Sequence, residues 1–329
     1  MRTRKIGTTD IEASIVALGT WAIGGGSWWG ETDDNLSMRA IHAALDAGIT
    51  MIDTAPAYGF GRSEEVIGKA IKGRRDKVIL ATKCGIWWRD ERGVPFLERD
   101  GQIISKSLLP ETIKQEIEWS LKHLGTDYID LYQTHWPSPK PQKDPISETM
   151  ACLLQLKEAG KIRAIGASNV NVSQIREYQA IGVLDAIQPR YSMLDRKIEQ
   201  DLLPDCIEQE ISTLVYSPME QGLLTGKIGM DRTFKEGESR NRIPWFKPVN
   251  RRRVLSMLDN WKDLTESYAC TLGQLVIAWT IEQPGVTFPL CGARKPEHAL
   301  ENAAAGDITL ESQDMQRMRD DVEALGEPE

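Results

Sequence analysis

The sequence predicts an α/β fold, a (β/α)8 TIM barrel with an N-terminal β-hairpin and long loops over the carboxyl ends of its strands. The first observation is an alternation, repeated eight times, of a short apolar or β-branched run with an amphipathic helical stretch. The second is that these runs suit parallel strands that are covered on both faces. The third is that no linker or change of composition divides the 329 residues, so we expect one domain over residues 1–329.

A short β-rich opening precedes the alternation and predicts the hairpin. The strand-like runs cover residues 15–19, 50–53, 78–83, 128–134, 162–168, 186–189, 211–216 and 286–290. The helical stretches include residues 35–47, 110–124, 146–159, 199–210, 251–267 and 272–283. Pro110 and Glu111 suit a first helical turn, and Gly125 and Gly160 follow helices where a left-handed residue is needed.

An open, doubly wound parallel sheet is the alternative fold. Such a sheet usually carries the glycine pattern G-x-G-x-x-G after its first strand. Here the glycines at 24–26 are followed by Ser27 and two tryptophans, so the third glycine of that pattern is missing. The pattern therefore favours the barrel.

Composition and charge exclude several classes of protein. A hydrophobic fraction of 41% is normal for a globular chain, and 40 basic against 48 acidic residues give a net charge of −8, which does not suit nucleic-acid binding. There is neither an apolar signal segment nor a membrane span, so we expect a cytoplasmic protein. The five cysteines form no C-x-x-C pair, which indicates reduced thiols and no metal site. Nothing indicates an oligomer.

The predicted strands deliver polar residues to one rim of the barrel, where catalytic groups of this fold lie. Taken singly, each is more often a capping or packing residue; together they indicate an active site. They are Asp53, Tyr58, Lys83, His135, Ser168, Asn169, Gln188, Tyr216 and Ser217.

Four of these residues predict proton transfer to a carbonyl oxygen. We expect Lys83 to favour the phenolate of Tyr58 and to lower its pKa from about 10, while Asp53 balances the charge of the lysine. His135 supplies a second donor to the carbonyl oxygen. Because this set lacks a nucleophile for the carbonyl carbon, a hydride from a bound cofactor is the natural one.

Seven segments carry a resemblance to a known family. They are GITMIDTAPAYGFGRSEEVIGKAI, ILATKCG, DYIDLYQTHWP, IRAIGASN, IQPRYSMLDR, LVYSPMEQGLLTGK and CGARKPEHALEN. In order and spacing the chain resembles the aldo-keto reductase superfamily over essentially its whole length. The opening GTWAIGGGSWWG is most similar to the bacterial branch of NADPH-dependent aldehyde reductases and polyol (glycerol) dehydrogenases.

The resemblance implies roles for individual residues. Asp53, Tyr58, Lys83 and His135 would form the catalytic tetrad, with Tyr58 as general acid in reduction and general base in oxidation. The implied cofactor-binding residues are Gly19, Thr20, Trp21, Ser168, Asn169, Gln188, Tyr216, Ser217, Gln221, Gly222, Leu224, Lys227, Gly292, Arg294, His298 and Asn302. Arg294 would bind the 2′-phosphate of the adenosine, so NADPH is the expected cofactor.

Ten tryptophans against five phenylalanines are unusual. Most follow predicted strand ends, where a flat ring with one N–H can exclude water and still bind a hydroxylated substrate. The expected substrate contacts are Trp21, Trp29, Trp87 and Trp136.

Two alternatives to a reductase stay open at this point. Lys83 could form a Schiff base, which would make the chain an aldolase, although a lysine kept charged by Asp53 is a poor nucleophile. The chain could instead be an NADPH-sensing regulatory subunit of the same fold. The sequence leaves open the substrate and the conformation of the loops after strands one, three and seven.

Overall fold

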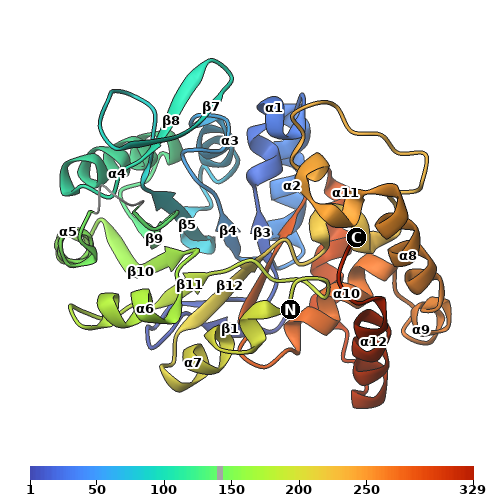
Figure 1. The fold of residues 1–329 in the computed structure, drawn as a ribbon. Coiled ribbons are helices and arrows are strands. Elements are labelled where there is room, and N and C mark those ends of the chain that lie inside the picture. Colours follow the sequence, from blue (N-terminus) through green and yellow to red (C-terminus); the bar gives the residue numbers. More distant parts are fainter. Residues whose placement is uncertain (139–143) are drawn as a thin grey trace.

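Eight parallel strands close into a barrel in the computed structural model, which describes residues 1–138 and 144–329 (Figure 1). Around the barrel they are β3 (Ala17–Gly19), β4 (Met51–Asp53), β5 (Ile79–Cys84), β9 (Ile129–Thr134), β10 (Ile162–Ser168), β11 (Ala186–Gln188), β12 (Ser212–Tyr216) and β13 (Phe288–Gly292). Each of the eight predicted runs overlaps one of these strands, which confirms the (β/α)8 fold.

Helices separate the strands in sequence and cover the outside of the barrel (Figure 1). The α-helices of the described residues are α1 (Gly26–Trp29), α2 (Asp34–Asp46), α3 (Arg62–Ala70), α4 (Pro110–Leu124), α5 (Ile146–Glu158), α6 (Val172–Gln179), α7 (Leu202–Glu208), α8 (Pro248–Asp259), α9 (Lys262–Ser267), α10 (Leu272–Ile281), α11 (Pro296–Ala304) and α12 (Ser312–Leu325). The stretch predicted as one helix over 251–267 is divided into α8 and α9 at Asn260 and Trp261.

The predicted N-terminal hairpin is present and covers the amino-terminal end of the barrel. Strands β1 (Thr3–Lys5) and β2 (Glu12–Ser14) pair antiparallel. Ile6, Ile11 and Ala13 are buried in one cluster with inward-facing barrel residues such as Met51 and Phe288. The hairpin thus closes the barrel below and leaves the carboxyl ends of the strands for the site.

The two-residue period of a strand sorts the barrel side chains into layers. Met51, Ala81 and Leu131 point inward and form part of the apolar core of the barrel. Two residues further along the same strands stand Asp53, Lys83 and Gln133, all buried. A polar layer therefore lies directly above the apolar one, at the carboxyl ends of the strands. The polar layer thus lies at one end of a closed barrel whose interior is filled with side chains.

The segment after β5 is more regular than the long loop expected there. Strands β6 (Ile86–Trp87), β7 (Val94–Arg99) and β8 (Gln102–Lys106) form a small antiparallel sheet in the order β6-β8-β7. In Figure 1 the hairpin of β7 and β8 lies at the same end of the barrel as α1, and a carboxylate oxygen of Asp100 lies 3.4 Å from the backbone nitrogen of Ser27. This sheet covers one side of the carboxyl-terminal rim.

Among the described residues, no helix has both the length and the apolar character that a membrane crossing requires.

The amino-terminal half of β9 carries a buried charge network that we expect to stabilise the fold. Asp130, 1% exposed, accepts hydrogen bonds from Arg75 at 2.8 Å, Arg163 at 2.7 Å and the backbone N–H of Leu80 at 2.9 Å. Asp130→Ala leaves these donors unpaired and is expected to lower the free energy of unfolding by about 3 kcal/mol. Urea unfolding followed by tryptophan fluorescence measures the change.

A matched control removes the other carboxylate beside Arg163. Asp10 is 90% exposed and lies 3.4 Å from Arg163, so Asp10→Ala is expected to change the unfolding free energy by less than about 1 kcal/mol. Equal losses in the two variants would contradict the role given to Asp130.

Candidate active site

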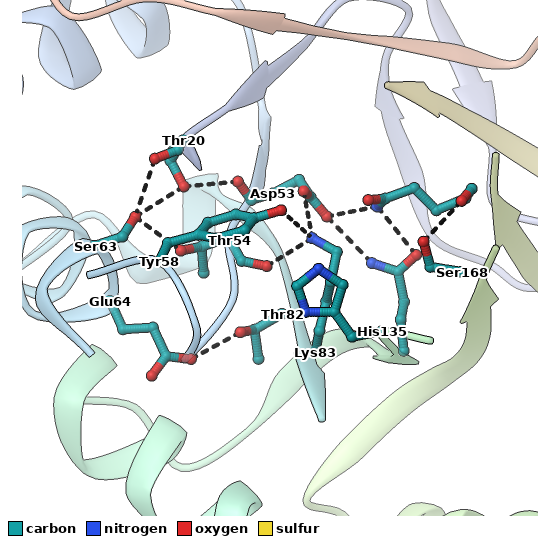
Figure 2. Close-up of polar contacts among 12 residues, drawn as sticks. Thr20, Asp53, Thr54, Tyr58, Ser63, Glu64, Thr82, Lys83, His135 and Ser168 are labelled. Carbon is teal, nitrogen blue, oxygen red and sulfur yellow. Dashed lines mark hydrogen bonds and ion pairs between the residues drawn. The ribbon is translucent and has the colours of Figure 1, made fainter. Parts of the chain in front are cut away.

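The four residues predicted to carry the chemistry come together at the carboxyl ends of neighbouring strands (Figure 2). Asp53 ends β4, Tyr58 lies in the turn that follows it, Lys83 lies in β5 and His135 follows β9. The rings of Tyr58 and His135 meet edge to face with centroids 5.8 Å apart. Sequence positions more than 80 residues apart thus form one cluster.

Lys83 is fully buried, and its ammonium group has an acceptor for each of its three N–H groups. The Nζ atom donates to Asp53 Oδ1 at 2.7 Å, to the backbone carbonyl of Thr54 at 2.8 Å and to the hydroxyl of Tyr58 at 3.3 Å. Burial lowers the pKa of Lys83, and the charge and hydrogen bond of Asp53 oppose this shift. The three acceptors match the three N–H groups of a protonated amine. A protonated amine has no lone pair with which to form a Schiff base, which argues against the aldolase alternative.

Asp53 is held by two amides in addition to Lys83. Its Oδ2 accepts from Gln188 Nε2 at 2.8 Å and from Gln133 Nε2 at 3.1 Å. Sequence reasoning missed Gln133. The strand period could have identified it, because Gln133 stands two residues before His135 and therefore faces the same side as the other inward residues.

A second network connects the ends of β10, β11 and β12. Ser168 Oγ donates to the carbonyl of Gln188 at 2.8 Å, and the Tyr216 hydroxyl donates to Asn169 Oδ1 at 2.9 Å. The amide of Asn169 in turn donates to the carbonyl of His135 at 3.0 Å. Asn169 has a positive φ of 60°, a conformation that asparagine adopts more readily than most residues other than glycine. This network joins the predicted cofactor residues to the tetrad.

A pocket of about 700 Å³ opens above these networks. Three of the four tetrad residues line it, Lys83 being buried below its floor. The predicted cofactor residues along its wall are Gly19, Thr20, Trp21, Ser168, Asn169, Gln188, Tyr216, Ser217, Gln221, Gly222, Lys227, Gly292, Arg294, His298 and Asn302. The strand ends and the loops therefore make one continuous cavity.

Leu224 is the exception among the predicted cofactor residues. It is fully buried in a hydrophobic cluster with Val254 and Trp279 and does not line the pocket. The turn thus directs this apolar side chain into the core and away from the pocket, and a role of Leu224 in cofactor binding stays a prediction.

Comparison with protein families gives a match over most of the chain. A model described as the aldo/keto reductase family covers residues 16–322. The chain belongs to the aldo/keto reductase family. Members of this family are oxidoreductases that use nicotinamide cofactors, which agrees with the hydride transfer expected from the sequence.

Similar proteins carry more specific names. The chain is 46% identical over 327 residues to an NADH-specific methylglyoxal reductase of Escherichia coli, covering 99% of both. It is 43% identical to the aldo-keto reductase YhdN of Bacillus subtilis, covering 95% of this chain and 91% of that one. A glycerol dehydrogenase structure from Gluconobacter oxydans superposes with a TM-score of 0.87 at 37% identity, covering 98% of this chain and 95% of that one.

In this aldo/keto reductase the loop after β12 is held in an uncommon backbone conformation. Ser217, Glu220 and Gln221 have φ values of 62°, 46° and 49°. The buried carboxylate of Glu220 pairs with Arg190 and accepts from Ser192 Oγ at 2.9 Å. These contacts fix the loop although its residues favour other conformations. Sequence reasoning missed Arg190, whose role depends on this long-range pair.

The four tryptophans expected to contact substrate divide into three that line the pocket and one that does not. Trp21, Trp29 and Trp136 line the pocket, and Trp21 packs edge to face on Trp29 with centroids 5.2 Å apart. Trp87 does not: it is 1% exposed, stacks on Trp119 of α4 at 5.3 Å and donates to Asp90 at 2.8 Å. The prediction that Trp87 contacts substrate is therefore wrong.

The electrostatics of Tyr58 differ from the expectation. Burial, and then the charge of Asp53, raise the pKa of Tyr58 well above its usual 10.0, where a lowered pKa was expected. The ammonium of Lys83 contributes little net positive charge because the carboxylate of Asp53 lies 2.7 Å from it. Tyr58 therefore holds its proton at neutral pH.

His135 is uncharged for related reasons. Burial lowers its pKa well below 6.5, and the nearby cations Lys83 and Lys106 lower it further. A neutral imidazole can donate one hydrogen bond without bringing a competing charge to the site.

Removing the Tyr58 hydroxyl is expected to stop turnover without loss of cofactor binding. Tyr58→Phe should lower kcat for aldehyde reduction by about 100- to 10,000-fold, the contribution of one positioned general acid. Fluorescence titration should give a cofactor dissociation constant within about twofold of wild type, since the phenol supplies a proton and not cofactor affinity. Tyr178→Phe, which removes a buried hydroxyl bonded to Thr134, is the control; full activity of Tyr58→Phe would refute the role.

The two pKa directions predict the pH dependence of the reaction. Between pH 6.5 and 10, the ordinary pKa values of the two side chains, His135 stays neutral and Tyr58 stays protonated. We therefore expect kcat for reduction to be flat in this interval. The reverse oxidation should rise with pH, because its base is the scarce phenolate. A pH profile of kcat in both directions tests this, and a reduction step that titrates near pH 7 would contradict it.

Proposed function

We propose that this aldo/keto reductase reduces small aldehydes and ketones to alcohols with NADPH, Tyr58 being the proton donor, and that the reaction also runs toward polyol oxidation. The contact between the ammonium of Lys83 and the hydroxyl of Tyr58, 3.3 Å apart beneath the pocket, carries this proposal. It holds a protonated phenol at a fixed point beside a neutral imidazole. A carbonyl oxygen that gains negative charge requires donors in this arrangement.

Each of the buried polar residues has its own role in the proposed proton transfer. Tyr58 donates its proton to the carbonyl oxygen, and His135 orients that oxygen. Lys83 keeps the phenol in place through its hydrogen bond to the hydroxyl, and the same hydrogen bond would remain on the phenolate oxygen after the transfer. Asp53 keeps Lys83 charged, and Gln133 and Gln188 fix Asp53.

The residues along the pocket suit a nicotinamide dinucleotide, which supplies the hydride when bound. Ser168, Asn169 and Gln188 offer amide and hydroxyl groups to a carboxamide, and Tyr216 offers a ring face. Further along the pocket, on the side of Arg294, Trp29 Nε1 and Arg240 Nε are buried N–H donors with no partner among the described residues. Such donors suit the anionic parts of the cofactor.

Arg294 supports the choice of NADPH. It lines the pocket two residues before α11, is half-buried and donates to the carbonyl of Trp29 at 3.2 Å. A planar guanidinium in this place suits a phosphate dianion. The Escherichia coli relative named as NADH-specific favours the second candidate, in which the same reaction uses NADH.

The names of the relatives support small, oxygen-rich substrates. Methylglyoxal is a short 2-oxoaldehyde and glycerol a short polyol, and both appear in the names of proteins similar to this chain. The aromatic wall formed by Trp21, Trp29 and Trp136 gives such molecules flat apolar faces with few polar groups.

The choice of cofactor is tested by steady-state kinetics with methylglyoxal and glyceraldehyde, following the absorbance of NADPH or NADH. Wild type is expected to show the higher kcat/KM with NADPH. Arg294→Met should lower the NADPH/NADH ratio of kcat/KM by about tenfold or more, since it removes a charge-assisted bond to phosphate. Lys295→Met is the control: Lys295 is 53% exposed and does not line the pocket, but the change of charge is the same.

Four outcomes would contradict parts of this proposal. A wild-type preference for NADH, or a ratio unchanged in Arg294→Met, would overturn the NADPH assignment alone. Negligible turnover of every carbonyl and polyol together with tight cofactor binding would favour the regulatory subunit. Covalent trapping of substrate on Lys83 by borohydride would favour the aldolase.

A further inference from the structure

One peptide group at the end of β5 is held by hydrogen bonds on both of its sides. The carbonyl of Cys84 accepts the backbone N–H of His135 at 2.8 Å. On the opposite side the N–H of Gly85 donates to Oε2 of Glu116, a residue of α4, at 2.8 Å. This carbonyl and this N–H belong to the same planar unit, in which they point in opposite directions. A carboxyl group of α4 and the backbone of His135 therefore hold one rigid peptide group between them.

The barrel strands offer no other partner for the N–H of Gly85. Strand β5 lies between β4 and β9, and the carbonyl of Cys84 faces β9, so the N–H of Gly85 faces the side of β4. The pairing of β4 with β5 ends with Asp53 opposite Ala81, four residues before Gly85. A buried N–H without a partner is costly, and Glu116 supplies the acceptor that the shorter strand does not.

Gly85 makes the turn that ends β5, and both of its backbone polar groups are bonded. Its φ of 93° is left-handed, and a side chain here would place its Cβ 2.5 Å from Cδ2 of Leu108. The carbonyl of Gly85 accepts from the N–H of Ser107 at 3.2 Å. The turn is thus fixed from β8 on one side and from α4 on the other.

Glu116 is a buried acid on an otherwise apolar face. It is 3% exposed, and the same face of α4 buries Ile113 and Ile117. Its second oxygen, Oε1, has no hydrogen-bond partner among the described residues. Burial raises the pKa of Glu116, the bond from Gly85 opposes this shift, and the charge of Glu64 adds to it. A carboxyl group protonated on Oε1 costs less to bury than a carboxylate with one bare oxygen, and its Oε2 remains an acceptor.

Loss of this acceptor would reach His135 through the peptide group. A Gly85 N–H left without a partner gains one by turning its peptide group toward another acceptor, and the carbonyl of Cys84 turns with it. The N–H of His135 then loses its own acceptor. The carbonyl of His135 is held separately, by the amide of Asn169 at 3.0 Å. The place of the imidazole at the pocket therefore depends on Glu116 for one of these two backbone supports.

We propose that Glu116 is a positioning residue, which sets the place of the His135 imidazole through the peptide group between Cys84 and Gly85. The proposal rests on the proposed reductase function, in which His135 orients the carbonyl oxygen of the substrate. Glu116 does not line the pocket, so it acts through the backbone alone.

The imidazole signals in an NMR spectrum of the full-length protein test the proposal without turnover. The chain has four histidines, and His135→Gln identifies the Cε1–H signal of His135. Glu116→Met removes the acceptor at a similar side-chain length and is expected to displace this signal by more than its linewidth, while that of His42, in α2, stays in place. Glu116→Gln keeps an oxygen for the N–H of Gly85 and should give the wild-type signal. Glu118→Met, at an exposed acid of α4, is the control.

Kinetics connect the place of the imidazole to the reaction. Glu116→Met is expected to lower kcat for methylglyoxal reduction by about tenfold or more, because a small displacement of a group that orients the substrate can cost about 100-fold. The dissociation constant of NADPH in fluorescence titration should change by no more than about twofold. Glu116→Gln should retain most of the wild-type kcat. A purely structural role would instead lower the thermal midpoint and leave kcat per folded enzyme unchanged.

Each result supports or overturns the proposal. A displaced His135 signal and a lower kcat in Glu116→Met, both restored in Glu116→Gln, support it. A folded Glu116→Met with the wild-type signal overturns it, and so does a displaced signal with an unchanged kcat. If Glu116→Met does not fold, Glu116→Asp, whose carboxyl group is one methylene shorter, takes its place with the same expectations. If wild type reduces no aldehyde, the reductase proposal fails, and the NMR comparison still tests whether Glu116 positions His135.

Discussion

The buried ion pair between Lys83 and Asp53 is the contact on which the rest of the site depends. Taking two charges out of water costs several kcal/mol for each, so the pair persists only because further hydrogen bonds satisfy both groups. Gln133, Gln188 and the carbonyl of Thr54 supply them. These residues come from β4, β5, β9 and β11 and the turn after β4, so the register of the closed barrel sets the geometry of the pair.

The neutrality of this pair explains the state of Tyr58. A lone ammonium 3.3 Å from a phenol would favour the phenolate, as the residue types suggested, but its charge is balanced by Asp53. Desolvation then dominates and keeps the proton on the phenol. In the proposed reaction this proton would leave only when a carbonyl oxygen in front of the phenol becomes negative, so the same desolvation would limit unproductive ionisation of Tyr58.

The fold and the tetrad could be predicted because each depends on local periodicity. Gly125 and Gly160 have the left-handed backbone that their places after helices required, and the two-residue strand period places Lys83 above Ala81. Trp87 shows where this reasoning fails. Gly85, with a φ of 93°, interrupts the alternation after β5 and turns Trp87 toward Trp119. Contacts such as Glu220 with Arg190 depend on loop conformation, which a strand or helix pattern does not encode.

Trp29 connects the two halves of the pocket. Its carbonyl accepts from Arg294, on the side expected for the adenosine, and its ring lies under the guanidinium of Arg240 and against Trp21. Trp21 in turn lies 6.4 Å from the ring of Tyr58. In the proposed function, a rearrangement of Arg294 toward a phosphate would remove one support of the aromatic wall beside Tyr58. Cofactor choice and substrate fit are then not independent properties of this barrel, because α1 carries a contact for each.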